Sequence, residues 1–398
     1  MARTMDWAAT RAAFELPEGV VYLDGNSLGP PPTAARAAMA RVQDEWADRL
    51  IRGWNECGWM DAPMAMGDRI GRLIGAPPGT TVVGDTLSVK VHQALAAALA
   101  ETDRRVILSD SGNFPTDLYM AEGLIAALDR GHALRVVAPE EVEGALSEEV
   151  GVLMLTHVDY RTGRMHDMAG LTARAREVGA LTVWDLAHSA GAVPLDVAGA
   201  GADFAAGCTY KYLNAGPGAP AFLHVREGLA ERVRPALSGW LGHAAPFAFE
   251  QGYRPAPGVA RMRVGTPPVL QMAALGAALD LWDGVDMGAV RARSLELSER
   301  LIAGVEAACP DLALASPRDG AARGSQVSFR HPEGYAIVQA LIARGVIGDF
   351  RAPDILRFGV TPLYLGEREI DAAVDHLAAV MAGREWDDPA HRARRGVT

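Results

Sequence analysis

The sequence predicts an α/β protein in which a large domain with a mostly parallel central sheet precedes a smaller α+β domain. Two observations carry this prediction. From residue 20 to about residue 208, short apolar runs rich in β-branched residues alternate with segments of helical periodicity. Such an alternation is typical of parallel sheets that helices cover on both faces. After about residue 265 long helical patterns replace it, which indicates a second unit of different architecture.

The first hundred residues contain signals for both kinds of element. In chain order we expect a strand at 20–24, helices at 32–50 and 64–75, a strand at 81–84 and a helix at 85–100. The first of these helices starts at a proline and the second ends at Gly75, which are preferred positions for these residues. Asp85 and Thr86 can cap the third helix.

The middle and the end of the chain continue the two patterns. In the middle we expect strands at 104–110, 134–139, 150–158, 180–188 and 202–208, with helices at 114–128 and 167–179. Further on we expect helices at 267–282 and 289–308, a strand at 325–330, a helix at 335–344, an apolar run at 346–351 and a last helix from Glu367. The helices of this final stretch are separated by few strands, which predicts an α+β unit.

Composition excludes several classes of protein. The net charge of −11 over 398 residues argues against a general affinity for nucleic acid or anionic membranes. We therefore interpret the basic run at 391–397 as a solvated tail. The three cysteines are far apart and no metal-binding spacing occurs, so we expect neither a disulfide framework nor a metal. No signal peptide or membrane span is visible, and we expect a cytoplasmic protein.

Polar side chains gather where the expected strands end. In open α/β sheets, ligands bind beyond the carboxyl ends of the strands. The polar residues at those ends are Asp85, Thr86, Ser88, Ser111, Asn113, Asp117, Thr156, His157, Asp185, His188, Thr209, Tyr210 and Lys211. This pattern predicts a site rich in hydroxyls and carboxylates that contains one amine.

Lysine is rare in this chain. Of 38 basic residues only Lys90 and Lys211 are lysine, so arginine supplies nearly all of the positive surface charge. A lysine amine can act as a nucleophile and form a Schiff base, whereas a guanidinium stays protonated. Lys211 follows an apolar strand, and we interpret it as a Schiff-base lysine rather than a capping or salt-bridging one. A phosphate contact or a structural contact suits Lys90 better.

Asp185 lies at the end of one expected strand, and the next strand along the chain leads to Lys211. A carboxylate there could bind a metal, pair with a cation in the core, or hold the ring nitrogen of pyridoxal 5′-phosphate, and the last interpretation agrees with a Schiff-base lysine. No Rossmann or Walker loop is present, so the phosphate would need Ser88 at a helix start, Tyr210 and Thr266 as donors. Phe114 suits ring stacking or core packing about equally, and Trp240 suits a ligand-facing position.

Seven stretches of the chain together resemble one family. They are DGNSLG (24–29), NFPTD (113–117), DLAHSAG (185–191), CTYKYLNAGPG (208–218), GWLGH (239–243), GTPP (265–268) and LRFGVTPLY (356–364). The chain resembles the kynureninases from about residue 20 to residue 382. That family belongs to fold type I of the pyridoxal-phosphate enzymes, in the branch of the class V aminotransferases.

The resemblance implies roles for particular residues. Lys211, Tyr210 and Asp185 would be catalytic, and Arg357 and Ser27 would bind substrate, with Arg357 holding its α-carboxylate. The cofactor shell would consist of Leu87, Ser88, Phe114, Asp117, Thr156, Asp185, His188, Tyr210, Lys211, Trp240 and Thr266, without a metal. Two positions depart from the family pattern, because Ser88 stands where threonine is frequent and Lys90 where asparagine is frequent.

The resemblance also implies an activity and an assembly. The reaction would be hydrolysis of L-kynurenine, or of 3-hydroxy-L-kynurenine, to anthranilate or 3-hydroxyanthranilate and L-alanine, in tryptophan catabolism or NAD biosynthesis. A homodimer with shared active sites would be expected. Residues 1–50 would form a segment that contributes to the small domain and the substrate site, 51–275 the large cofactor domain, and 276–398 the small domain.

Other functions remain open at this point. The nearest is another fold type I enzyme, such as a cysteine desulfurase or an aminotransferase. A desulfurase needs a mobile catalytic cysteine, and Cys57, Cys208 and Cys309 have no evident loop context for that. A non-catalytic regulatory protein fits less well, because the chain is acidic, lacks a DNA-binding appendage and keeps both Lys211 and Arg357.

Overall fold

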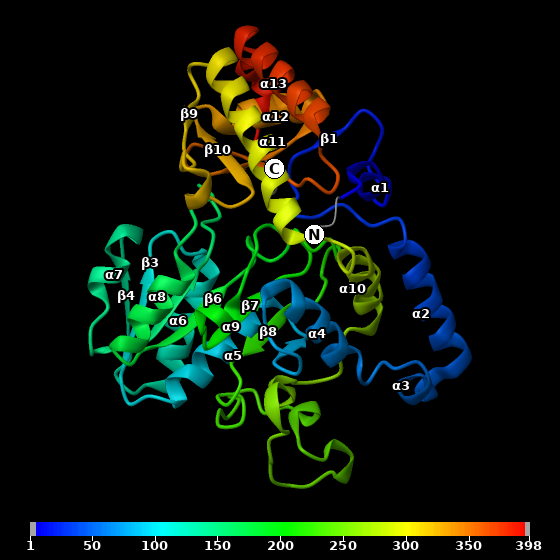
Figure 1. The fold of residues 1–398 in the computed structure, drawn as a ribbon, viewed down its shortest axis with the longest axis vertical. Helices are drawn as coiled ribbons and strands as arrows, with labels where there is room; N and C mark the ends of the chain where they lie inside the picture. The colour runs from blue at the N-terminus through cyan, green and yellow to red at the C-terminus, as the bar shows by residue number, and fades with distance from the viewer. Residues whose placement is uncertain (1–4, 395–398) are drawn as a thin grey trace.

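A seven-stranded sheet forms the centre of the computed structural model, which describes residues 5–394 (Figure 1). Its strand order is β2-β8-β7-β6-β5-β3-β4. The strands are β2 (Thr81–Val83), β3 (Val106–Asp110), β4 (Ala133–Val137), β5 (Val150–Thr156), β6 (Leu181–Asp185), β7 (Phe204–Gly207) and β8 (Phe222–Val225). All neighbouring pairs are parallel except those that involve β8, which is antiparallel to both β2 and β7.

Helices cover both faces of this sheet. Alternate residues of β5 show the two sides, because Val152 and Met154 pack with α5 (Leu87–Ala100) and α6 (Pro115–Leu128), whereas Leu153 and Leu155 belong to the cluster that includes α8 (Met168–Glu177). The second face also receives α4 (Ala62–Ile74) and α10 (Val269–Trp282), and the short helices α7 (Val142–Ala145) and α9 (Val197–Ala200) lie between strands. Burial on both faces explains why the strands read as continuous apolar runs.

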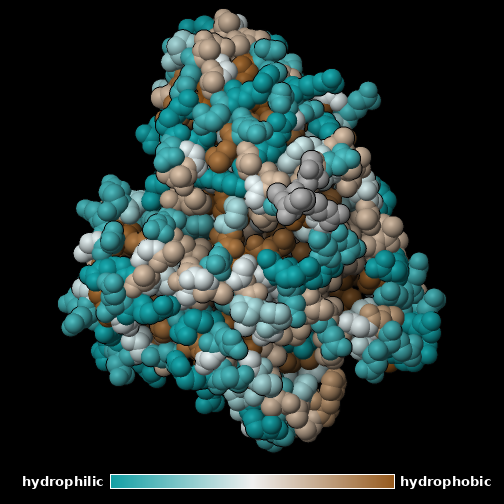
Figure 2. Space-filling view, viewed as in Figure 1, coloured by the Kyte–Doolittle hydropathy of each residue, from teal (hydrophilic) through white to brown (hydrophobic). Residues whose placement is uncertain are grey.

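The C-terminal part has its own antiparallel sheet, of order β12-β13-β10-β9. Its strands are β9 (Ala313–Leu314), β10 (Gln326–Arg330), β12 (Asp349–Arg351) and β13 (Ile355–Gly359). The accompanying helices are α11 (Met287–Ala308), α12 (Gly334–Ala343), α13 (Glu367–Ala382) and α14 (Pro389–Arg392). In Figure 1 this part lies above the central sheet, and Figure 2 shows apolar surface between the two.

The N-terminal residues join the C-terminal part and then cross to the central sheet. After α1 (Trp7–Ala12), β1 (Val21–Tyr22) pairs in parallel with β11 (Val346–Ile347). The long helix α2 (Ala35–Arg49) then packs along α10, and α3 (Gly53–Glu56) leads to α4 (Figure 1). The expected division at residues 50 and 275 stays a prediction.

Most expected elements are present, with shifted ends. The strand expected at 20–24 is reduced to two residues, and the helix expected from residue 32 begins at Ala35. Gly75 ends α4 in the left-handed conformation, with φ of 69°, as its position predicts. The run at 346–351 is split into β11 and β12. We did not expect β8, β9 or β13 as strands: β9 has only two residues, and His224 and Arg357 interrupt the short apolar runs of β8 and β13.

Three sequence expectations concern the basic tail, membrane spans and metal sites. Residues 395–397 of the basic C-terminal run lie outside the described residues. Within residues 5–394, no helix is long and apolar enough to cross a membrane. Within the same range, no group of three or more His, Cys, Asp and Glu side chains could hold a metal ion.

Candidate active site

Lys211 lies beyond the carboxyl ends of the parallel strands, four residues after the end of β7. Its Nζ is 3.0 Å from Nε2 of His188. The same atom is 5.9 Å from the centre of the Phe114 ring and 5.8 Å from that of the Tyr210 ring. A half-buried amine therefore faces an imidazole and two aromatic rings.

A tight approach of the N-terminal DGNSLG turn fixes the chain around this lysine. The Gly29 N–H donates to the Tyr210 carbonyl oxygen at 2.8 Å. A Cβ on Gly29 would collide with the Lys211 carbonyl oxygen and with Asn214. Only glycine allows this contact, so the turn that carries Ser27 is held against the lysine segment.

Asp185 and Asp117 form a buried carboxyl pair next to the lysine. β5 and β6 are in register at Thr156 and Asp185, which brings the ends of these strands together. Burial raises the pKa of Asp185, and Lys211 opposes that rise. Burial, and then the Asp185 charge, raises the pKa of Asp117 well above its usual range. Two buried carboxyls this close cannot both ionise at little cost, so the pair holds a proton.

His188 is neutral at physiological pH. Burial lowers its pKa well below the usual range, and the charges of Lys211, Arg357 and Arg351 lower it further. Since His188 is 3.0 Å from Lys211, its neutral Nε2 can accept a hydrogen bond from the Lys211 amine. Because the charges of Arg357 and Arg351 lower the pKa of His188, these arginines lie close enough to the lysine site to affect its electrostatics.

The N-terminus of α5 provides the expected anion-binding end of a helix. Thr86 caps it, accepting from the Val89 N–H at 3.5 Å, and Leu87 and Ser88 are its first two residues. The N–H groups of a first helical turn have no partner within the helix and favour an anion. Thr86 and Thr266 line one cavity of about 300 Å³ at this end.

Lys90 makes structural contacts. Its buried Nζ lies 3.0 Å from Asp85 Oδ2 and donates to Gln93 Oε1 at 3.0 Å and to the Met262 carbonyl at 3.1 Å. Burial lowers its pKa, and the Asp85 charge opposes that shift. The amine ties the first turns of α5 to the segment before Thr266, which is one of the two roles expected from the sequence.

Arg357 lies in a second polar cluster that joins both ends of the chain. Its Nε donates to Asp349 Oδ1 at 2.6 Å, and its Nη2 donates to the other oxygen of the same carboxylate and, at 3.0 Å, to Ser27 Oγ. The Ser27 hydroxyl in turn donates to Asp349 Oδ2 at 2.6 Å. The structure thus brings together the two residues expected to bind substrate.

The expected residues differ in how closely they meet. Lys211, His188, Asp185, Asp117, Tyr210 and Phe114 gather at one place, and Thr156 is held there by donation to Asn113 Oδ1 at 2.5 Å. Trp240 is instead half-exposed and contacts Phe247, with ring centres 5.8 Å apart. Within residues 5–394 no described contact joins Trp240 to this group.

Sequence reasoning missed Asp349, Arg351 and Tyr160. The Tyr160 carbonyl accepts from Arg357 Nη1, and its ring meets Phe114 edge-on at 5.1 Å. A signal for Asp349 did exist, because it is a lone carboxylate inside the apolar run VIGDF. Buried carboxylates of this kind need a cation, and the chain supplies Arg357 and Arg351.

These residues fit pyridoxal phosphate. The fit rests on a half-buried amine beside a buried carboxyl pair, one of whose oxygens, Asp117 Oδ2, has no hydrogen-bond partner within residues 5–394. The ring nitrogen would meet this carboxyl pair, Phe114 would supply an aromatic ring face, and the start of α5 would supply N–H groups for a phosphate.

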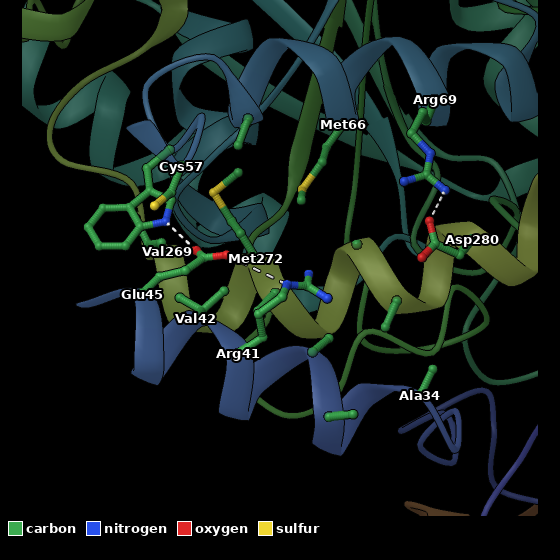
Figure 3. Close-up of a pocket in the computed structure, with 17 residues that line it drawn as sticks. Ala34, Arg41, Val42, Glu45, Cys57, Met66, Arg69, Val269, Met272 and Asp280 are labelled. Atoms are coloured by element: carbon green, nitrogen blue, oxygen red, sulfur yellow. Dashed lines mark hydrogen bonds and ion pairs between the residues drawn. The ribbon is translucent and has the colours of Figure 1, made fainter. Parts of the chain in front are cut away.

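A separate cavity of about 440 Å³ lies between α2, α4 and α10 (Figure 3). Arg41 and Glu45 line it from α2, Cys57 and Met66 lie across from them, and Arg69 binds Asp280 at 2.8 Å. No residue expected in the cofactor shell lines this cavity.

Comparison with known proteins identifies the family. A family model described as the kynureninase C-terminal domain matches residues 290–377. A curated kynureninase from Pseudomonas fluorescens is 50% identical over 400 residues, which cover 98% of this chain and 96% of that protein. The chain belongs to the kynureninase family. A kynureninase from Burkholderia pseudomallei (strain 1106a) is 49% identical over 403 residues, with the same coverage of both chains.

Solved structures confirm the expected fold class. A cysteine desulfurase from Thermococcus onnurineus superposes with a TM-score of 0.81 at 18% identity, covering 96% of this chain and 100% of that one. A variant of C-DES, with glycine linked covalently to its pyridoxal-phosphate cofactor, also gives a TM-score of 0.81, at 20% identity over 94% of this chain and 99% of that one. Kynureninases and these enzymes thus share fold type I, and at these identities the likeness shows the fold alone.

Proposed function

We propose that this chain binds pyridoxal phosphate through Lys211 and hydrolyses the Cβ–Cγ bond of L-kynurenine, which yields anthranilate and L-alanine. The observation that carries the proposal is one amine, Lys211, next to a buried carboxyl pair and to His188. The pKa of His188 is lowered by burial, by Lys211 and by Arg357 and Arg351 of the polar cluster around Asp349, called the arginine cluster below. Membership of the kynureninase family supports the choice of substrate.

Each residue has a defined task in this proposal. Asp185 would hold the ring nitrogen, with Asp117 beside it, and the cofactor would supply an electron sink. Lys211 would hold the cofactor and would also move the proton of the substrate Cα. The neutral His188 stabilises Lys211 at 3.0 Å without adding a charge.

Tyr210 acts on the later proton transfers. Its pKa is raised, first by burial and then by the neighbouring Cys208, so the phenol keeps its proton at physiological pH and can donate it. Water adds to the substrate γ-carbonyl, the Cβ–Cγ bond breaks, and the proton carried by Tyr210 completes L-alanine. Arg357 and Ser27 orient the substrate through its α-carboxylate.

A homodimer is part of the proposal. Several large apolar side chains are strongly exposed, among them Trp46 at 58%, Ile51 at 77% and Phe249 at 77%. Exposed apolar surface of this kind favours association with a second copy. Trp240 or Thr266 would then act at the cofactor of the partner subunit, and within residues 5–394 the described ring contact of Trp240 is with Phe247 and not with Lys211 or its neighbours. Location in the cytoplasm stays a prediction from the sequence.

Product analysis tests the reaction. Purified protein supplied with pyridoxal phosphate should release anthranilate and alanine in equal amounts from L-kynurenine, and 3-hydroxy-L-kynurenine is the second substrate to compare. Sulfide release from cysteine with no anthranilate from kynurenine would contradict the proposal in favour of a desulfurase. The buried positions of Cys208 and Cys309 argue against that alternative.

A further inference from the structure

Arg351 is a second arginine on the face of the sheet that carries Arg357. β12 and β13 are antiparallel, with Asp349 opposite Arg357. Side chains two residues apart on a strand point to the same face, so Arg351 stands beside Asp349 and faces the same way. The contacts agree, because Arg351 Nη2 lies 2.9 Å from Asp349 Oδ2 and 3.4 Å from Ser27 Oγ.

Arg357 has few donors left for a ligand. A guanidinium carries five N–H groups, and in Arg357 four of them donate to the two oxygens of Asp349, to Ser27 Oγ and to the Tyr160 carbonyl. Only 1% of its side chain is exposed. A carboxylate that arrives from solvent can therefore receive at most one hydrogen bond from Arg357 unless the Asp349 pair opens.

Arg351 is more accessible to solvent than Arg357. Its side chain is 35% exposed. Its Nη2 bonds to Asp349 and Ser27 and its Nη1 donates to the Phe350 carbonyl at 2.8 Å, which leaves donors on Nε and Nη1. Arg351 therefore offers an incoming anion both access and unused hydrogen bonds.

The charges of the cluster also favour an anion. Two guanidinium groups share the single buried carboxylate of Asp349, whose pKa Arg357 and Arg351 lower against the effect of burial. The other nearby acid, Asp24, has its pKa raised to about 7, chiefly by burial. It therefore neutralises only part of the excess positive charge of the two arginines. A bound carboxylate would balance the remaining positive charge of the cluster.

We propose that Arg351 binds the substrate α-carboxylate directly as the second cation of the site, and that Asp349 is the positioning residue that holds Arg351 and Arg357 side by side. This proposal deepens the proposed function and rests on it. Arg357 then supplies one hydrogen bond and fixed positive charge, while Arg351 supplies the accessible donors. A paired arrangement of arginines suits a planar carboxylate.

The test compares two ligands on Arg351→Gln. The first is L-kynurenine, and the second is its decarboxy analogue, which has the same amine and aryl ketone without the α-carboxylate. The loss of a hydrogen bond to a charged group should raise KM for L-kynurenine about tenfold to a hundredfold, with a smaller effect on kcat. Affinity for the decarboxy analogue, followed by the visible absorption of the bound cofactor, should change less than about twofold.

Arg344→Gln is the matched control. Arg344 lies in the same part of the chain, is 32% exposed and pairs with Glu385 at 3.3 Å. Its substitution should leave both ligands unaffected. The proposal is overturned if Arg351→Gln keeps the parent KM, or if it weakens both ligands equally, since the α-carboxylate would then not be what Arg351 binds.

Two further measurements keep the test decisive. If Arg351→Gln loses the cofactor band, the same comparison is made on Arg351→Lys, where L-kynurenine should weaken more than the decarboxy analogue and equal weakening contradicts the proposal. The parent protein is assayed alongside. Absence of turnover in the parent would refute the proposed function itself, whereas normal parent turnover with an unchanged Arg351→Gln refutes only the role of Arg351.

Discussion

The two lysines of this chain occupy opposite surroundings. Lys90 is fully buried and surrounded by oxygens from Asp85, Gln93 and Met262. Lys211 is half-buried, and its described polar partner is the nitrogen of His188, which burial keeps neutral. Oxygen acceptors hold the Lys90 amine in the core, whereas Lys211 meets a neutral imidazole and two aromatic rings at the strand ends, where a ligand can reach it. The difference separates a structural lysine from a reactive one.

The largest effect is expected from Lys211→Arg. Guanidinium cannot form the covalent link to the cofactor, so the variant should lose the visible absorption of bound pyridoxal phosphate, and turnover of L-kynurenine should fall by at least about 10⁴-fold. Absorption spectra and anthranilate release measure both. Turnover at the parent rate would remove Lys211 from the mechanism.

Asp185→Asn should have the next largest effect. The amide cannot hold a proton on the ring nitrogen by charge, so kcat should fall about 10²–10³-fold while the cofactor remains bound. Steady-state kinetics on protein saturated with pyridoxal phosphate measure this. An unchanged kcat would show that Asp185 serves only to pack the strand end beside Asp117.

Lys90→Met should act on stability rather than chemistry. It removes the ion pair to Asp85 and the donor to Gln93 Oε1, while the Met262 carbonyl keeps the bond from Gln93 Nε2 at 3.2 Å, which should lower the free energy of unfolding by about 1–3 kcal/mol. Denaturant unfolding measures the change, and turnover at saturating cofactor should be retained. A stable Lys90→Met protein without turnover would break the distinction between the two lysines.

The last prediction concerns the pH dependence of stability through Asp24, near the arginine cluster. Its pKa in the folded chain is raised from 3.8 to about 7, first by burial, so the folded state binds this proton more tightly than the unfolded state. The contribution to stability is complete below about pH 4, declines as the pH rises toward 7 and levels out above it. Asp24→Asn should lack this decline, as Tm measured from pH 4 to pH 8 would show, and a parallel decline in both proteins would contradict the assignment.

The sequence predicted the lysine site better than the arginine cluster. Long apolar strands indicated the sheet, so the residues at their ends, Asp185 and Lys211, could be placed together from the sequence pattern alone. The partners of Arg357 could not be found this way, because Ser27 lies in a turn near the N-terminus and Asp349 lies on β12, which is only three residues long. Trp240 was expected to line the lysine site, and no described contact within residues 5–394 joins it to that site.

The arginine cluster also depends on contacts distant in sequence. Ser27 and Asp349 meet at 2.6 Å although 322 residues separate them. The turn that carries Ser27 follows β1, which pairs with β11 just before Asp349. Local propensity does not encode such a pairing, since it arises only when the N-terminal strand joins the C-terminal part.

The most direct test of the account is to locate the cofactor on the chain. Protein loaded with pyridoxal phosphate is reduced with borohydride, digested and analysed by mass spectrometry for the modified lysine. Because the chain has only two lysines, the assignment has no ambiguity among side chains. The account predicts the modification on Lys211, with Lys90 unmodified; a modified Lys90 with a free Lys211 would contradict it.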